Sequence, residues 1–141
     1  MNIRKISYKD FHNNYFDLLN QLTDIEKEKI TFDKFKHFID NLDDNHQIMV
    51  IELNNKIIGS GTLLVENKII HGLGKVGHIE DIVVDTTQRG LGLGRKIIDH
   101  LTKLAESLNC YKVILNCNES NVKFYEKCGY KKKEFEMVKY F

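Results

Sequence analysis

The chain has 141 residues, of which 42% are apolar and 29% are charged, as is typical of a soluble globular domain large enough to bury a core. Its 21 lysines and arginines nearly balance its 20 aspartates and glutamates, so the net charge of +1 gives no general reason to bind nucleic acid or an anionic membrane. No apolar run approaches the roughly 18 residues of a membrane span, and the amino terminus turns polar too soon for a signal peptide.

The number and spacing of the cysteines indicate which cofactor and which compartment to expect. Cys110, Cys117 and Cys128 are odd in number and are spaced for neither a disulfide framework nor a zinc site. We therefore expect no metal and a reducing compartment, the cytoplasm. The sequence contains no repeat, linker or low-complexity tract, so residues 1–141 are expected to form a single domain.

The first third of the chain predicts a short strand followed by two helices. Residues 3–7 are strand-like, and apolar side chains recur at helical spacing from Phe11 to Leu22. Thr31 is a plausible N-cap for the second helix. The inward side of that helix is expected to carry Phe32, Phe35, Phe38, Ile39 and Leu42.

The rest of the chain completes a mixed α/β domain, in which helices cover a sheet. Strands are expected at 47–53, 56–66, 76–85, 111–115 and 135–141. The first two of these are predicted to form a hairpin. A strongly amphipathic helix is expected at 93–108 and a shorter one at 119–128, with Gly129 in the place of a left-handed cap.

A glycine-rich turn joins a predicted strand to the long helix. It contains Gly90, Gly92 and Gly94, and Arg89 and Arg95 flank these glycines. Glycines let backbone amides approach a ligand, a helix N-terminus attracts phosphate, and guanidinium groups suit phosphate oxygens. A tight turn that needs glycine for its geometry alone is the alternative, but three glycines with two arginines favour a phosphate site.

The spacing of this turn excludes two phosphate motifs and matches a third. The turn contains no P-loop string, and its last glycine interval is wrong for a dinucleotide fingerprint. The pattern Arg89-x-x-Gly92-x-Gly94 instead resembles the pyrophosphate loop of the GNAT N-acetyltransferases, which bind acetyl-CoA. The resemblance implies that acetyl-CoA contacts Ile82, Val83, Val84, Arg89, Gly90, Leu91, Gly92, Leu93, Gly94, Arg95 and Tyr125.

Neighbouring segments narrow the resemblance. Residues 77–84, 109–115 and 121–130 closely resemble the eukaryotic-type glucosamine-6-phosphate N-acetyltransferases, a GNAT subfamily. This implies the GNAT fold, a mixed central sheet with a splayed strand pair for acetyl-CoA. It also implies acetyl transfer to the amine of D-glucosamine 6-phosphate, giving N-acetylglucosamine 6-phosphate and CoA for UDP-N-acetylglucosamine biosynthesis.

The strand before the turn breaks its own alternation. Each face would mix an acid with apolar residues, and a β-bulge near residues 80–82 would resolve the conflict. By the resemblance, the backbone amide of Ile82 lies near the thioester carbonyl as an oxyanion donor. Glu80 is then the group that positions and deprotonates the amine, directly or through water, and Asp81 binds a sugar hydroxyl. The alternative for both acids is a solvated position at the end of a strand.

Tyr125 matches the tyrosine that protonates the departing thiolate in this family. A phenol with a pKa near 10 stays protonated at pH 7 and can donate. From the residues alone, an ordinary core aromatic is the better interpretation, because Tyr125 shares a helix face with Val122 and Cys128. The positions that the resemblance matches to the acceptor are Thr23, Lys68, Ile69, Ile70, His71, Glu80, Asp81, Asn116 and Tyr140.

Two of these positions depart from the family pattern. Asn116 replaces an acid that helps to bind the sugar, and Tyr140 replaces an arginine that reaches the sugar phosphate from a dimer partner. Lys68 could supply the missing cation, or Lys139 after a change of register, because Lys139 points to the opposite face of a strand. Because both departures touch the acceptor, two alternatives stay open. One is a different amine, such as another amino sugar, a polyamine or a protein amine, and the other is a module that binds acetyl-CoA without catalysis.

The end of the chain predicts a homodimer. Phe135, Met137, Val138, Tyr140 and Phe141 are too apolar for an exposed edge strand. We therefore expect this last strand to pair with a partner copy and to complete its active site. No contact with nucleic acid or membrane is expected.

Overall fold

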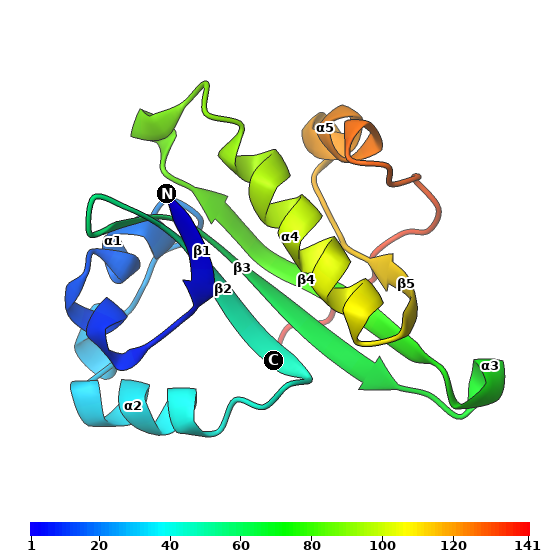
Figure 1. Ribbon diagram of the computed structural model, residues 1–141, viewed down its shortest axis with the longest axis horizontal. Coiled ribbons are helices and arrows are strands. Elements are labelled where there is room, and N and C mark those ends of the chain that lie inside the picture. The colour runs from blue at the N-terminus through cyan, green and yellow to red at the C-terminus, as the bar shows by residue number, and fades with distance from the viewer.

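The computed structural model describes residues 1–141 and shows a twisted sheet with helices on both faces (Figure 1). Neighbouring strands are antiparallel except for the last two, which are parallel. Five of the six expected strands, all but the last, are confirmed, each within two residues of an observed one. In the order that they take across the sheet, the strands are β1 (Asn2–Lys5), β2 (His46–Leu53), β3 (Lys56–Asn67), β4 (Lys75–Val84) and β5 (Cys110–Ile114).

The long helix α4 (Leu93–Ser107) covers one face of the sheet, where it crosses β3 and β4 (Figure 1). Its apolar stripe includes Ile97, Ile98 and Leu101, all fully buried. Burying each such side chain stabilises the fold by roughly 1.5–3 kcal/mol. The predicted amphipathic helix is therefore confirmed, and it anchors the turn that precedes it. No helix of the chain combines the length and the apolar character needed to cross a lipid bilayer.

The amino-terminal third packs on the opposite face. Alternate residues of β2 divide between the two sides, because Met49 and Ile51 belong to the core under α4, whereas Ile48 and Val50 belong to the second core. The elements on this side are η1 (Tyr8–His12), α1 (Tyr15–Leu19), η2 (Lys27–Lys29) and α2 (Phe32–Asp40).

The single helix expected from Phe11 to Leu22 is wrong, because the chain breaks at Asn14. The backbone of Asn14 has φ +48°, and its side chain exchanges hydrogen bonds of 3.0 and 3.1 Å with the backbone of Ile57. Asparagine tolerates the left-handed region and can bond to backbone groups instead of continuing a helix. The break therefore links the amino-terminal third to the start of β3.

The cap of α2 is confirmed, but its inward face is narrower than expected. The hydroxyl of Thr31 accepts a hydrogen bond from the Lys34 amide at 3.2 Å. Phe35 is buried, whereas Phe32 and Phe38 are 40% and 48% exposed. A helix at the edge of a sheet can bury only a narrow stripe, so part of the predicted apolar face stays in solvent.

The strand expected at 135–141 does not form in the single chain. After η4 (Glu119–Asn121), α5 (Val122–Lys127) and the left-handed Gly129, the chain has no regular structure from residue 130 onwards. Figure 1 shows this segment passing behind the sheet. A strand needs a neighbour for its backbone hydrogen bonds, and no strand of the same chain pairs with residues 135–141.

Candidate active site

Strand β4 contains the β-bulge that its sequence predicts. The register between β3 and β4 slips, so that Asp81 and Ile82 lie opposite the single residue Gly61. Asp81 takes up the extra residue with φ +52°. As a result, Ile79 and Ile82 both pack against the core under α4 although they are three positions apart. The bulge thus places an irregular peptide unit in the middle of a buried strand.

Strand β4 also parts from β5 just before the bulge. The two strands pair over only four residues of β4, and the last pair is His78 with Ile114. From Ile79 to Val84 the edge of β4 that faces β5 has no strand partner. The splayed strand pair expected from the sequence is therefore present.

The bulge leaves two neighbouring acids, Glu80 and Asp81, exposed. Burial raises the pKa of the Tyr15 phenol, and the nearby negative charge of Asp81 raises it further. Tyr15 belongs to the core on the side of α1, so Asp81 lies on the face opposite α4. The two acids are thus accessible on that face, next to the unpaired edge of β4.

The glycine turn follows η3 (Thr86–Gln88) and opens α4. Gly90 and Gly92 have φ of +83° and +64°, and no heavy atom lies within 4 Å of where a Cβ would stand at either position. No side chain caps the N-terminus of α4. Free amides beside open, Cβ-free space suit phosphate oxygens. A Cβ at Gly94 would instead lie 3.1 Å from the Phe124 ring, so this third glycine serves the packing of α5.

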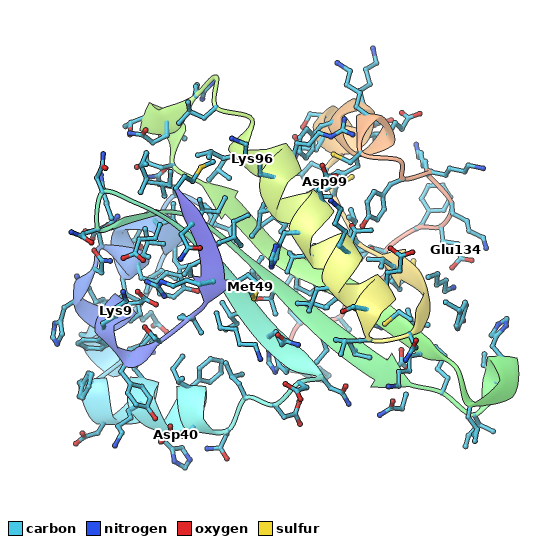
Figure 2. The ribbon with its side chains drawn as sticks, in the orientation of Figure 1. Lys9, Asp40, Met49, Lys96, Asp99 and Glu134 are labelled. Atoms are coloured by element: carbon cyan, nitrogen blue, oxygen red, sulfur yellow. The ribbon has the colours of Figure 1, made fainter.

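The two arginines of the turn differ in their availability. The guanidinium group of Arg95 donates to the Lys127 carbonyl oxygen at 2.7 Å and lies 3.4 Å from the Asp99 carboxylate. Figure 2 labels Asp99 on the side of α4 that faces α5. The exposed Arg89 donates only to the carbonyl of Thr86, at 3.3 Å. Arg89 is therefore the better placed of the two for a ligand, whereas Arg95 ties α5 to α4.

Most of the other residues expected to hold the coenzyme have side chains that face the protein core. Leu93 and Val83 are buried, whereas Leu91 is exposed. Ile82 and Val84 pack against the core under α4. The backbone of 82–84 and of the turn is therefore what these positions can offer to a ligand.

Tyr125 is half-buried on α5 and lines a hollow of about 780 Å³. This hollow lies between β5, α5 and the segment 130–136, and Asn116 and Cys117 also line it. Burial raises the pKa of the Tyr125 phenol, so that it stays protonated at neutral pH. The structure brings Tyr125 and Asn116 to one hollow, but no residue of the glycine turn lines it.

The remaining residues matched to the acceptor lie at the surface in separate places. Thr23 follows α1, and Tyr140 lies in the last segment. Residues 68–71 include the start of α3 (Ile70–Leu73), at the tip of the β3–β4 hairpin. The ring of His71 lies 4.4 Å from that of Tyr111. The single chain does not bring these three segments together.

Lys68 belongs to a small charged cluster that the sequence did not indicate. Its ammonium group lies 3.2 Å from the Glu66 carboxylate, and the His78 ring lies 3.0 Å from the same group. Hydrogen bonds from His78 and then Lys68 hold the pKa of Glu66 below its usual value. Glu66 belongs to β3, Lys68 follows that strand and His78 belongs to β4, so the strand register was needed to predict the contact with His78.

A second contact missed in the sequence links the loop that carries Thr23 to the end of β4. The side-chain oxygen of Gln21 accepts a hydrogen bond from the Thr86 amide at 2.9 Å, and its nitrogen donates to the buried Asp85 at 3.4 Å. The partners are 64 and 65 residues away in the chain. A single polar residue in a loop gives no sequence signal of such a contact.

Comparison with known proteins identifies the family. Residues 8–130 match the model of the Acetyltransferase (GNAT) family, so the chain belongs to the GNAT acetyltransferases. These acyltransferases use acetyl-CoA. The fold that the sequence predicts, a mixed sheet with flanking helices and a splayed strand pair, is confirmed.

Within this family the chain is similar to glucosamine 6-phosphate N-acetyltransferases along nearly its whole length. The protein of that name from Arabidopsis thaliana is 42% identical over 99% of this chain and 95% of its own. The one from Candida albicans is 42% identical over 96% and 92%. The crystal structure of the Arabidopsis thaliana protein matches with a TM-score of 0.95 and 40% identity, covering 99% of this chain and 97% of the other. An acetyltransferase from Trypanosoma brucei matches with a TM-score of 0.89 and 32% identity, covering 99% of both chains.

Proposed function

We propose that this chain transfers the acetyl group of acetyl-CoA to the amine of D-glucosamine 6-phosphate. The observation that carries the proposal is the bulge at Asp81 and Ile82, which lies where β4 leaves β5 and leads into the glycine turn. This position puts free backbone groups beside two acids and a phosphate site. The similarity to proteins named for this reaction, at 42% identity, supports the choice of acceptor.

Backbone groups hold most of the coenzyme in this proposal. The amides of Gly90 and Gly92 and the N-terminus of α4 bind the pyrophosphate, and Arg89 adds a positive charge. The pantetheine arm lies along the free edge of β4 from Ile82 to Val84, because a strand edge offers alternating donors and acceptors. Apolar side chains at these positions are compatible with such binding, since they face the two cores.

The acceptor amine must be neutral to attack the thioester carbon. A sugar amine resembles an α-amino group, with a pKa of about 8, so the neutral form costs only about 1.4 kcal/mol at pH 7. The amine nitrogen forms the new C–N bond, and its proton passes to Glu80, directly or through water. Asp81 binds a sugar hydroxyl and fixes the ring beside the thioester.

The tetrahedral intermediate is stabilised by the backbone and collapses with help from Tyr125. The N–H of Ile82 donates to the oxyanion as negative charge develops on it. The C–S bond then breaks, and the thiolate takes a proton from the Tyr125 phenol. Burial raises the pKa of this phenol, which keeps the proton on it until the thiolate forms.

The acceptor site is completed by a second copy of the chain. Phe135, Met137 and Tyr140 are 85%, 92% and 88% exposed, which is unfavourable for an apolar segment of a monomer. A homodimer in which residues 135–141 pair with the partner would cover them and bring Tyr140 to the partner's acceptor site. Lys68 then supplies the cation for the sugar phosphate, or Lys139 does so after a change of strand register, since residues 139 and 140 of a strand point to opposite faces. Asn116 binds the sugar without charge.

The dimer is tested by light scattering and by removal of residues 135–141. We expect a dimer at micromolar concentration, and a shortened chain that is monomeric and inactive although it still binds acetyl-CoA. A full-length monomer with full activity would contradict the dimer.

The acceptor is tested by comparing catalytic efficiency on glucosamine 6-phosphate and on glucosamine. Each charge-assisted hydrogen bond to phosphate contributes roughly 1.5–3 kcal/mol, so the free sugar should be at least about tenfold poorer. Equal efficiency would point to another amine, which thiol release over a panel of amino sugars, polyamines and peptides would identify. No thiol release with any amine would favour a module that only binds the coenzyme. We further propose the cytoplasm as the compartment, which fractionation of the source cells would test.

A further inference from the structure

Gly61 lies opposite the bulge and has no room for a side chain. A Cβ at this position would lie 2.5 Å from Cδ1 of Ile82, 2.9 Å from Cδ1 of Leu101 and 3.2 Å from Cγ1 of Ile97. Carbon atoms in favourable contact stand about 3.5–4.0 Å apart. The side chain of Ile82 therefore occupies the space that any other residue at position 61 would fill.

This packing confines the side chain of Ile82, whose backbone amide belongs to the bulge. The Ile82 side chain packs between β3 and α4. Asp81, the residue before it in the chain, has φ +52°. These two neighbouring residues share the peptide unit that carries the Ile82 N–H. We propose that Gly61 is a positioning residue, which holds the Ile82 N–H in the direction of the thioester oxygen. This inference rests on the proposed function, in which that N–H is the oxyanion donor.

Gly59, two residues earlier on β3, provides a matched comparison. A Cβ there would also meet a crowded site, 2.8 Å from Cδ1 and 3.1 Å from Cγ1 of Ile51. Ile51 belongs to β2, on the side of β3 away from the bulge. The two glycines thus share a strand and a tight surrounding, but only Gly61 contacts the residue whose amide is proposed to act.

We expect Gly61→Ala to impair turnover more than coenzyme binding. The three crowded atoms belong to side chains, so the variant should fold with Ile82 displaced. Loss of an oxyanion donor lowers kcat by about 10²–10³-fold, and a displaced donor should lower it about tenfold to a hundredfold. The KM for acetyl-CoA should change less than about threefold, because the glycine turn that holds the pyrophosphate is untouched.

The experiment compares Gly61→Ala, Gly59→Ala, Ile82→Val and the double variant Gly61→Ala with Ile82→Val. Valine lacks Cδ1, the atom nearest to the new methyl group, so the double variant should recover most of the kcat of Ile82→Val. Steady-state kinetics for both substrates, urea unfolding and the backbone amide resonances of residues 80–83 are measured for each. Gly59→Ala should lose similar stability, keep its kcat and leave these resonances unchanged.

Three outcomes would overturn the inference: an equal loss of kcat in Gly59→Ala, no rescue in the double variant, or unchanged resonances at residues 80–83 in Gly61→Ala. If Gly61→Ala alone is too unstable, the double variant decides by its kcat relative to Ile82→Val. Failure of the proposed function has a different signature, which is a wild-type protein that does not acetylate glucosamine 6-phosphate. The resonances still report in that case whether Gly61 sets the peptide unit at Ile82.

Discussion

The coenzyme half and the acceptor half of the proposed site are built in different ways. The bulge lies within β4 and the glycine turn leads directly into α4, where Leu93 and Ile97 are 3% and 0% exposed. Apart from Glu80 and Asp81 at the bulge, the acceptor half consists of surface segments, in which Ile69 and Tyr140 are 84% and 88% exposed. In the proposed site, coenzyme binding would therefore be a property of one folded chain, whereas acceptor choice would depend on segments that can change with little effect on the core.

The largest effect is expected at the glycine turn. Gly92→Val places a branched side chain at φ +64°, beside amides that must reach phosphate, and should abolish acetyl-CoA binding in calorimetry. Gly129→Val is the control, because Gly129 also has positive φ and open surroundings but caps α5 instead. Near-normal binding of acetyl-CoA by Gly92→Val would show that the glycines only shape the turn. It would also contradict the assignment of the turn to the coenzyme half.

The second effect is expected at Tyr125, which is proposed to protonate the departing thiolate of the coenzyme. Tyr125→Phe removes the proton donor for the thiolate and should lower kcat about 10²–10⁴-fold, with little change in acetyl-CoA affinity. Tyr130→Phe is the control, because its half-buried hydroxyl lies 2.6 Å from that of Thr102. A kcat of Tyr125→Phe within about twofold of the wild type would assign Tyr125 to packing alone.

A smaller effect, in the opposite direction, is expected in the acceptor half. Tyr140→Arg should raise the catalytic efficiency on glucosamine 6-phosphate about tenfold, because it adds a charge-assisted bond to phosphate. Asn116→Asp should raise the catalytic efficiency on glucosamine 6-phosphate by a few-fold, because it restores the negative charge beside the amine. Glucosamine is the control substrate for Tyr140→Arg, since it lacks the phosphate. The same gain in catalytic efficiency on both sugars would show that residue 140 does not contact the phosphate.

The smallest effect is expected at Asp85, the buried residue at the end of β4 to which Gln21 donates a hydrogen bond from the loop that carries Thr23. Hydrogen bonds from the backbone and then the hydroxyl of Thr87 hold the pKa of Asp85 below its usual value, against the effect of burial. The resulting stability is present above the unfolded-state pKa of about 4 and is lost as pH falls through the lower folded-state pKa. Asp85→Asn should lower the unfolding free energy by about 1 kcal/mol at pH 7. The loss should shrink below pH 4, as measured by urea unfolding, whereas a loss independent of pH would contradict this origin.

Local patterns in the sequence predicted most of the fold and the coenzyme half of the site. The broken alternation around Glu80 predicted the bulge, and the glycines of the turn predicted the free helix end. Contacts between distant residues could not be predicted, because neither partner carries a local signal. Asn14 breaks a helix to bond Ile57, and Arg95 uses its guanidinium group on the end of α5 instead of leaving it free.

The strand expected at 135–141 could not be judged from one chain. Its apolar residues correctly indicate a surface that is unfavourable in solvent, but the backbone partner that would make it a strand is not within the chain. A pattern of side chains can predict that a segment should be covered. It cannot say whether the same chain or a second copy provides the cover.

The free edge of β4 also has a thermodynamic consequence. A sheet normally gains stability from each strand added to its edge, but β5 stops pairing at His78 and leaves the edge from Ile79 to Val84 to other partners. A ligand that binds only the folded chain stabilises it by about 2.7 kcal/mol when its concentration is 100 times its Kd. Acetyl-CoA bound along this edge would stabilise the folded chain, as a further strand would. The melting temperature and the resistance to proteolysis of this protein are therefore expected to rise and fall with the supply of acetyl-CoA around it.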